Sequence, residues 1–289
     1  MTMKRVGFIG TGVMGSSIVE HLLQNDYEVT VFNRTKKKTD HLVQLGAEWK
    51  ESPKEVARDS DVIFTMVGYP SDVEEVYYGE RGVFQNDMKG KILIDLTTST
   101  PSLAEKIYNT AAEKGGSALD APVSGGDLGA RNGTLTIMVG GDEQTFTEAE
   151  KIMSLFSKTL ERHGPAGSGQ HTKMANQIMV AGTMTGMTEM LVYAQKAGLD
   201  LEKVIRTLNG GAAANWSLAN YRPRILKEEY SPGFFVKHFI KDLKIVLEEA
   251  EKMAIDLPGT KKAKALYDQL QDNGFENDGT QALIRLWWE

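Results

Sequence analysis

Residues 6–15 read Val6-Gly7-Phe8-Ile9-Gly10-Thr11-Gly12-Val13-Met14-Gly15, so a short apolar run leads directly into three spaced glycines. A helical pattern follows over residues 16–24, which places these glycines between an expected strand and an expected helix. In that setting the G-x-G-x-x-G spacing indicates dinucleotide binding: the first glycine permits a tight turn, the second lets the backbone approach a pyrophosphate, and the third lets the helix pack against the strand. The N–H groups and the dipole at the helix start favour the phosphates. We therefore expect a cofactor-binding turn made by Gly10, Thr11, Gly12, Val13 and Met14.

The next expected strand, residues 28–32, bears on the choice between NAD and NADP. Chains that bind NAD usually place Asp or Glu about 20 residues beyond the glycines, where it holds the ribose 2′-OH. This chain has Asn33, Arg34 and Thr35 there, followed by three lysines. No carboxylate stands at this point of the sequence to repel a 2′-phosphate, and the Arg34 guanidinium can pair with that phosphate and stack on adenine. An exposed basic helix start is the alternative for the lysines, but the pattern as a whole predicts NADP in preference to NAD.

Length and composition exclude several classes of protein. The 289 residues suffice for two domains, and the net charge of −6 argues against a nucleic-acid partner, whose phosphates need a basic surface. The chain has no cysteine, which excludes disulfides and thiolate chemistry and suits a reducing cytoplasm. No signal peptide is expected, and the longest weakly polar stretch, residues 174–194, contains polar side chains typical of a buried helix rather than a membrane span. The five histidines lack metal-ligand spacing, so we expect no metal.

The order of expected elements predicts two domains. Strands alternate with helices up to residue 163, with further strands expected over residues 61–67, 91–96, 118–121 and 134–139. This order is typical of a doubly wound, mainly parallel Rossmann sheet. Strand patterns then stop, and a long helix rich in Met, Ala, Gly and Thr begins near residue 170 and ends near residue 198. We predict an α/β domain over residues 1–163 and an all-α domain over residues 164–289, joined by this long helix, which should be buried on most sides. Shorter helices are expected over residues 201–208, 222–229, 236–254, 259–271 and 280–287.

Two segments follow expected strands, and ligands of open α/β sheets bind outside the carboxyl ends of the strands. The hydroxyl of Ser124 and the N–H groups around Gly125 and Gly126 suit a carboxylate, although an ordinary turn explains these residues equally well. Thr98 follows the strand that ends near Leu96, at the edge where the nicotinamide half of a cofactor should pass.

The start of the long helix carries the candidate for proton transfer. Lys173 and Asn176 are three residues apart and therefore share a helix face. An amine near the positive end of a helix dipole, among small and apolar neighbours, should lose proton affinity and come within range of proton transfer to or from a hydroxyl. A surface lysine with its amine in water is the alternative. Lys241 and Asp242 form a further charged pair, which an ordinary helix surface also explains.

Taken together, these motifs resemble those of the β-hydroxyacid dehydrogenase family, which includes 3-hydroxyisobutyrate dehydrogenases, tartronate semialdehyde reductases and glyoxylate/succinic semialdehyde reductases, and is related to 6-phosphogluconate dehydrogenase. The resemblance covers essentially the whole chain. It rests on the glycine turn, on Asp120-Ala121-Pro122-Val123-Ser124-Gly125-Gly126, on Gly167-Ser168-Gly169 through Lys173 and Asn176, and on Lys241-Asp242-Leu243. The segment Gly68-Tyr69-Pro70 departs from the shorter Leu-Pro turn of many relatives.

The resemblance implies a role for each motif. Lys173 would be the catalytic acid/base, and Asn176 would assist it in substrate binding. Ser124, Gly125 and Gly126 would hold the substrate carboxylate. Thr98 and Lys241 would line the nicotinamide pocket, with Lys241 also near the substrate, and Val67 would pack near the cofactor. Asn33, Arg34 and Thr35 resemble the NADP-using branch.

We therefore interpret the chain as an NADP-dependent reductase of a small aldehyde acid, which in reverse oxidises a 3-hydroxy acid. A non-catalytic NADP sensor would need no Lys173, and imine reductases, which resemble this family in fold, tend to replace that lysine. A decarboxylating sugar-acid dehydrogenase is disfavoured because the second domain is short. The apolar segment Leu286-Trp287-Trp288 should be covered, so we expect a homodimer or homotetramer.

Overall fold

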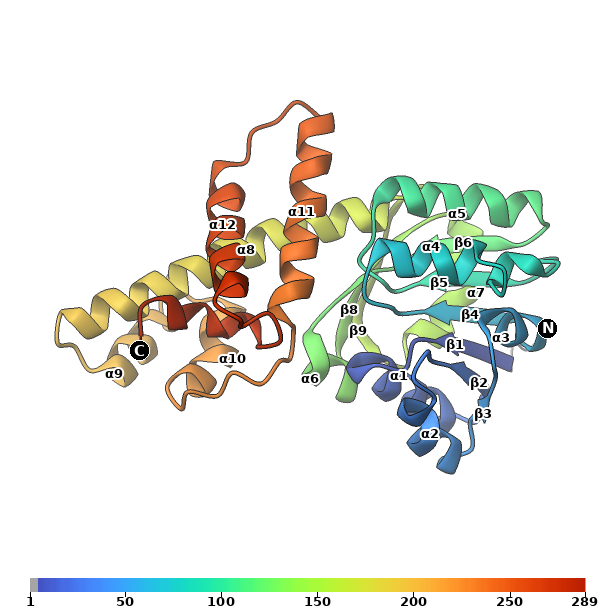
Figure 1. Cartoon of the computed structure of the whole chain (residues 1–289), viewed down its shortest axis with the longest axis horizontal. Coiled ribbons are helices and arrows are strands. Elements are labelled where there is room, and N and C mark those ends of the chain that lie inside the picture. Colours follow the sequence, from blue (N-terminus) through green and yellow to red (C-terminus); the bar gives the residue numbers. More distant parts are fainter. Residues whose placement is uncertain (1–4, 289) are drawn as a thin grey trace. The chain divides into compact units, whose positions relative to one another are not determined.

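A computed structural model describes residues 5–288 (Figure 1). The chain divides into two compact units, Met1–Lys173 and Met174–Glu289. The division falls inside the long helix α8 (Ser168–Lys196), whereas the predicted domain boundary is at residue 163. The predicted combination of an N-terminal Rossmann sheet and a C-terminal helical domain is confirmed.

Within the described residues, the first unit contains one nine-stranded sheet. Six strands run parallel in the order β3-β2-β1-β4-β5-β6, and the order reverses between β1 and β4, which is the point where such sheets bind ligands. β8 runs antiparallel to β6 and β7, and β9 runs parallel to β8. The strands are β1 (Arg5–Ile9), β2 (Glu28–Phe32), β3 (Glu48–Trp49), β4 (Val62–Thr65), β5 (Ile92–Asp95), β6 (Ser117–Asp120), β7 (Val123–Ser124), β8 (Leu135–Gly140) and β9 (Ser157–Gly164).

Helices cover both faces of this sheet, as Figure 1 shows. Successive strand residues point to opposite faces, so Phe8 packs in the core under α1, α6 and α7, while Ile9 packs in the core under α3, α4 and α5. Burial on both faces explains why the central strands read as continuous apolar runs. The helices are α1 (Val13–Gln24), α2 (Asp40–Gln44), α3 (Pro53–Asp59), α4 (Pro70–Tyr78), α5 (Pro101–Glu113), α6 (Gly126–Arg131) and α7 (Glu143–Met153), with 3₁₀ turns η1 (Lys36–Thr39) and η2 (Val83–Gln85).

Local signals account for several element ends. The Ser52 and Thr100 side chains accept hydrogen bonds from the backbone N–H groups of Glu55 and Leu103, and a proline occupies the first position of each helix. β9 was not predicted, because it lies at an exposed edge and consists mainly of polar and charged residues rather than an apolar run.

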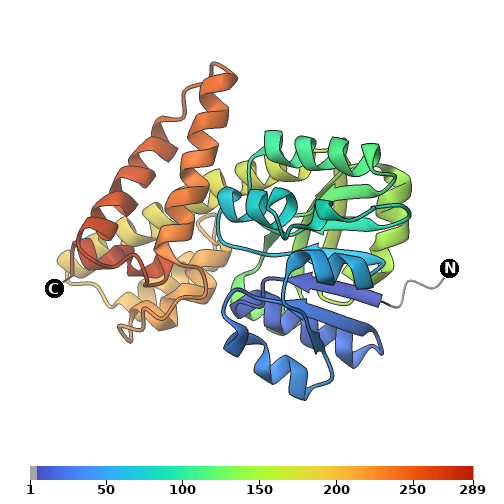
Figure 2. The ribbon, with the colours of Figure 1, turned by 45° about the vertical axis from the view of Figure 1, so that its right-hand side comes forward.

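The described part of the second unit is helical, apart from one bridge between Phe235 and Gly279. Figure 2 shows α11 and α12 as a packed pair, and Phe239 meets Tyr267 between them with ring centroids 4.9 Å apart. The elements that follow α8 are α9 (Leu201–Leu208), α10 (Trp216–Ile225), α11 (Val236–Lys252), α12 (Pro258–Asp272) and η3 (Thr280–Leu286). The predicted position of one helix, residues 222–229, is wrong. The observed helix α10 begins earlier, at Trp216, because the Asn215 side chain caps it by accepting a hydrogen bond from the Leu218 N–H.

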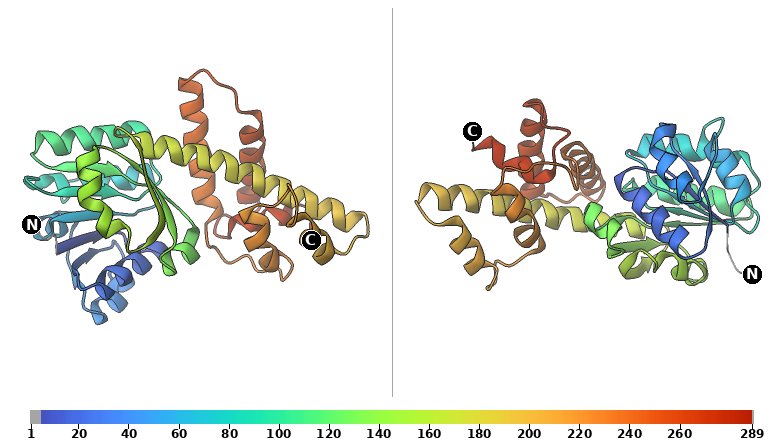
Figure 3. Two further views of the ribbon diagram at one scale, coloured as in Figure 1. Left: turned by 180° about the vertical axis from the view of Figure 1, so that it is seen from behind. Right: turned by 90° about the horizontal axis from the view of Figure 1, so that it is seen from below.

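The long helix α8 is one continuous rod in both views of Figure 3. Its existence and length were predicted. The expectation of burial on most sides holds for the side that carries Met184, Met187 and Leu191, but one stripe is open to solvent. Met179 and Tyr193 on that stripe are 67% and 75% exposed. Among residues 5–288, no helix has the length and apolar character needed to cross a bilayer.

Candidate active site

The glycine turn lies at the carboxyl end of β1. Gly10 has φ of +103°, and a side chain there would collide with the Met66 carbonyl oxygen, so both conformation and space require glycine. A Cβ added to Gly12 would meet nothing within 4 Å, which leaves the backbone open to a ligand. A Cβ at Gly15 would collide with the Gly10 carbonyl oxygen, where α1 packs against the turn. The first turn of α1 presents N–H groups that have no preceding helical acceptor, and this arrangement fits a pyrophosphate.

Arg34 lies just beyond the end of β2, and its guanidinium is paired. Arg34 Nη1 is 3.0 Å from Asp72 Oδ1, while the Arg34 side chain is 82% exposed. Asp72 belongs to the first turn of α4, where its Oδ2 accepts a hydrogen bond from the Tyr69 N–H at 3.2 Å. No carboxylate stands beside Arg34 in the sequence, yet the fold brings one to it from the segment after Gly68-Tyr69-Pro70. Asn33 Nδ2 donates to the Thr35 carbonyl at 3.0 Å and closes the turn around Arg34.

The loops that follow β4 and β5 are joined at the same edge of the sheet. The Val67 N–H donates to Thr97 Oγ1 at 3.0 Å, and the Thr97 N–H donates to Asp95 Oδ1 at 2.9 Å. Thr98 is half-buried between Thr97 and Ser99, which are both buried. Val67 and Thr98 therefore lie on neighbouring loops beyond the parallel strands, on the side of the sheet where the glycine turn is found.

The start of α8 is held by side chains on two sides. Asp120, at the end of β6, accepts the Gly167 N–H at Oδ1 and the Gln170 N–H at Oδ2, each at 2.8 Å. Burial raises the pKa of the Asp120 carboxyl, although these N–H groups act in the opposite direction. The buried Gln170 side chain accepts the Ser99 N–H at 2.9 Å and donates to the Thr97 carbonyl at 2.8 Å. The first turn of α8 is thereby tied to both β6 and the loop after β5.

Lys173 lies one helical turn further along α8. Its side chain is buried, with 6% of the residue exposed, so the alternative of a surface lysine with its amine in water is wrong. Lys173 Nζ donates to the Val123 carbonyl oxygen at 2.9 Å. Val123 and Ser124 form β7, and Gly125 and Gly126 follow with φ of +128° and +63°. The structure therefore brings the Lys173 amine to the segment predicted to bind a carboxylate.

Asn176 and Lys241 are connected within the second unit. Asn176 Nδ2 donates to Gln177 Oε1 at 2.7 Å, and Gln177 Nε2 donates to Asp242 Oδ2 at 2.6 Å. Lys241 Nζ is 2.7 Å from Asp242 Oδ1. Asp242 is 1% exposed, which excludes the alternative of an ordinary surface charge. These contacts fix the side chains of Asn176 and Lys241 through Asp242, which was predicted only as the charged partner of Lys241, and through Gln177, which had no predicted role.

Sequence reasoning missed the roles of Gln170 and Gln177. Both are buried, and with Lys173 they follow the spacing i, i+3 and i+7, which places three polar residues on one face of a helix rich in apolar and small residues. Polar residues at this spacing in an otherwise apolar helix could have indicated a buried polar site from the sequence. Among residues 5–288, no group of three or more His, Cys, Asp or Glu side chains is placed to hold a metal ion.

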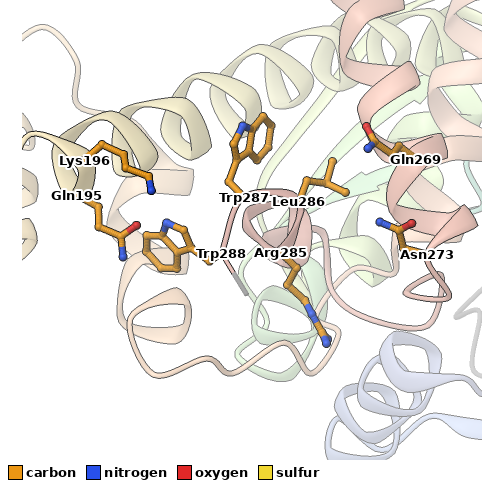
Figure 4. A pocket seen from close by; sticks show the side chains of 8 residues that line it. All are labelled: Gln195, Lys196, Gln269, Asn273, Arg285, Leu286, Trp287 and Trp288. Carbon is orange, nitrogen blue, oxygen red and sulfur yellow. The ribbon is translucent and has the colours of Figure 1, made fainter.

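A pocket of about 630 Å³ in the second unit contains none of the predicted site residues. Figure 4 shows Trp288 beside Gln195 and Lys196, with Gln269 and Asn273 of α12 on the other side. Trp288 packs against the core of its own unit, whereas Trp287 remains partly exposed. The expectation that both rings are covered therefore holds for Trp288 without any second chain.

Known proteins resemble the chain along its whole length. Residues 5–164 match the family described as the NAD binding domain of 6-phosphogluconate dehydrogenase, and residues 167–287 match the family described as NAD-binding of NADP-dependent 3-hydroxyisobutyrate dehydrogenase. An uncharacterized oxidoreductase of Bacillus subtilis, YkwC, is 54% identical over 284 residues, which cover 98% of this chain and 99% of that protein. A probable mitochondrial 3-hydroxyisobutyrate dehydrogenase-like protein of Arabidopsis thaliana is 48% identical, and the match covers 97% of this chain and 84% of that protein.

The solved structures include the 3-hydroxyisobutyrate dehydrogenase of Mycobacterium tuberculosis with L-serine. It superposes with a TM-score of 0.90 at 25% identity, and the match covers 100% of both chains.

Proposed function

The chain belongs to the β-hydroxyacid dehydrogenase family as an NAD(P)-dependent enzyme of the 3-hydroxyisobutyrate dehydrogenase type, and from this we propose that it is an NADPH-preferring reductase of a small aldehyde acid. In reverse it oxidises the corresponding 3-hydroxy acid. One observation carries the proposal: a buried lysine amine, Lys173 Nζ, lies 2.9 Å from the Val123 carbonyl oxygen, next to Ser124. A protein that merely sensed the nucleotide would gain nothing from an amine held there.

Each residue of the site has a defined task in this proposal. The Ser124 hydroxyl and the backbone at Gly125 and Gly126 bind the substrate carboxylate and so orient the aldehyde. When bound, the cofactor supplies the hydride in reduction and accepts it in oxidation. Lys173 Nζ gives a proton to the substrate oxygen during reduction and takes one during oxidation. Asn176 hydrogen-bonds that oxygen and is itself held by Gln177.

The cofactor contacts are proposed along the carboxyl edge of the sheet. The turn of Gly10, Thr11, Gly12, Val13 and Met14 would hold the pyrophosphate, which its open backbone supports. Asn33, Arg34 and Thr35 would surround the adenosine 2′-phosphate. Val67, Thr98 and Lys241 would line the nicotinamide end. The preference for NADPH rests on Arg34, whose guanidinium is exposed and hence accessible to a phosphate.

Asp72 should weaken this preference, because its carboxylate pairs with the guanidinium that the 2′-phosphate needs. Replacing Asp72 with asparagine removes the competing charge and keeps an acceptor for the Tyr69 N–H. We expect the Michaelis constant for NADPH to fall by up to about fivefold, since an exposed ion pair contributes roughly 0.2–1 kcal/mol. The constant for NADH, which has no 2′-phosphate, serves as the internal control. An unchanged or higher constant for NADPH would show that Asp72 does not compete.

The proposed reaction is tested with a substrate panel. Glyoxylate, succinic semialdehyde, methylmalonate semialdehyde and tartronate semialdehyde are each supplied with NADPH and with NADH, and the absorbance of the reduced nicotinamide is followed. Turnover of at least one of them, faster with NADPH, supports the proposal. Tight NADPH binding without any turnover would favour a nucleotide sensor. Reduction of a cyclic imine in place of these aldehydes would favour an imine reductase.

We also propose that the chain forms a homodimer or homotetramer, while its location in the cytoplasm stays a prediction. The stripe of α8 that carries Met179 and Tyr193 exposes large apolar side chains, and the partly exposed Trp287 adds another. Sedimentation velocity at micromolar concentration should give a species at least twice the 31.9 kDa of one chain. Replacing Tyr193 with glutamate should shift the protein toward the monomer. A wild-type chain that sediments as a monomer would contradict the proposal.

A further inference from the structure

The carboxylate of Asp120 joins the sheet to the start of α8. Asp120 is 4% exposed, and both of its oxygens are occupied by backbone N–H donors from the segment that begins this helix. The donors, Gly167 and Gln170, lie on either side of Ser168, where α8 begins. A carboxylate suits this place because it offers acceptors in two directions at once, and because the positive end of the helix dipole compensates its charge.

The room for this carboxylate is made by two glycines. A Cβ added to Gly140, which pairs with Asp120 between β8 and β6, would collide with Asp120 Oδ1. A Cβ added to Gly169 would lie 2.8 Å from Asp120 Oδ2 and 2.6 Å from the Asp120 carbonyl oxygen. Neither position therefore has room for a side chain, and the Asp120 carboxylate lies where those side chains would be.

The position of the Lys173 amine depends on this junction. A lysine side chain has four flexible carbons, so its amine is placed accurately only when its backbone is fixed and its stem is packed. Lys173 is three residues beyond Gln170, whose N–H is bound by Asp120 and whose side chain bonds the Thr97 carbonyl and the Ser99 N–H. The amine then meets the Val123 carbonyl three residues beyond Asp120 itself. The same short segment thus holds both the helix that carries Lys173 and the acceptor of its amine.

We propose that Asp120 is a positioning residue, which fixes the first turn of α8 and thereby holds the Lys173 amine beside Ser124. This inference rests on the proposed function in one respect, namely that Lys173 transfers the proton. Asp120 itself contacts backbone groups of this chain and has no part in the proton transfer.

The test is a double-mutant cycle of Asp120→Asn and Lys173→Ala. Asparagine has nearly the same shape, but it provides one oxygen, and its NH₂ group must face one of the two N–H donors. With Lys173 present, Asp120→Asn should lower kcat on the order of tenfold, because a displaced catalytic group loses its alignment. In the Lys173→Ala background the same change should lower kcat by less than about twofold, since residues that act as a unit are not additive. Equal losses in both backgrounds would overturn the proposal.

A second measurement needs no turnover. Trace acetylation with acetic anhydride, followed by mass spectrometry, compares the buried Lys173 with the exposed Lys244 as internal reference. Asp120→Asn should raise the labelling of Lys173 relative to Lys244. Val83→Ala, which removes buried methyl groups from η2 next to α3 and α4, controls for a general loss of stability and should leave that ratio unchanged.

These two readouts separate the possible failures. If the wild-type enzyme turns over no substrate, the proposed function fails, and the labelling ratio alone decides whether Asp120 positions the amine. If Asp120→Asn does not fold, Asp120→Ser, which keeps one acceptor in a smaller volume, takes its place in both measurements. An unchanged labelling ratio in the folded variant would overturn the positioning role.

Discussion

Replacing Lys173 with alanine should lower kcat by about 10²–10⁴-fold, the usual contribution of a positioned proton donor, while NADPH binding stays nearly intact. The physical reason lies in the contacts of the side chain. Lys173 is buried, and its amine donates to the Val123 carbonyl, next to the segment proposed to bind the substrate. We therefore expect its loss to remove a proton donor and to leave the glycine turn proposed to bind the pyrophosphate in place.

The measurement is kcat with the best aldehyde acid, together with fluorescence titration of NADPH. Lys173→Arg should not restore the rate, because a guanidinium keeps its proton and has a different shape. Lys196→Ala is the matched control, since Lys196 is an exposed lysine at the other end of the same helix, and it should behave as wild type. A Lys173→Ala enzyme that keeps more than about a tenth of kcat, when chemistry limits the rate, would remove Lys173 from this role.

The second large effect is expected at Arg34. Arg34→Ala should raise the Michaelis constant for NADPH by roughly 10- to 100-fold and change that for NADH little, because a hydrogen bond to a charged group contributes about 1.5–3 kcal/mol. The phosphate must displace Asp72 from the guanidinium, so the effect should be larger in the Asp72→Asn background. Lys37→Ala is the control for a general electrostatic attraction of the cofactor by the exposed lysines that follow Arg34 in the sequence. Equal changes for both cofactors would contradict the assignment of Arg34.

The parts of the fold that could be predicted depend on local contacts. β2 was predicted at its observed ends. The starts of α3 and α5 are also marked in the sequence by a serine or threonine before a proline, because each cap is a bond between residues three apart. β9 was missed because an exposed edge strand needs no apolar run. α10 was misplaced because the capping role of Asn215 was not considered.

The candidate site likewise has features that the local sequence predicts and features that it does not. The burial of Lys173 could be predicted from the composition of its helix. The contact of Asp120 with Gly167 joins residues 47 apart, and that of Gln177 with Asp242 joins residues 65 apart. Such contacts depend on how strands and helices pack, and no local pattern contains them. The carboxylate of Asp72 is the clearest example, because the residues next to Arg34 suggested that no such group was near.

The edges of the nine-stranded sheet have a consequence for the behaviour of the protein at high concentration. β3 and β7 contain two residues each, and β9 presents Lys158, Glu161 and Arg162 along its length. Short edge strands and charged edge residues prevent the backbone of another chain from adding a strand. Addition of a strand from another molecule to this sheet is therefore disfavoured, even when the molecules are crowded. This protection against edge-to-edge aggregation does not depend on catalysis and should persist in every active-site variant named above.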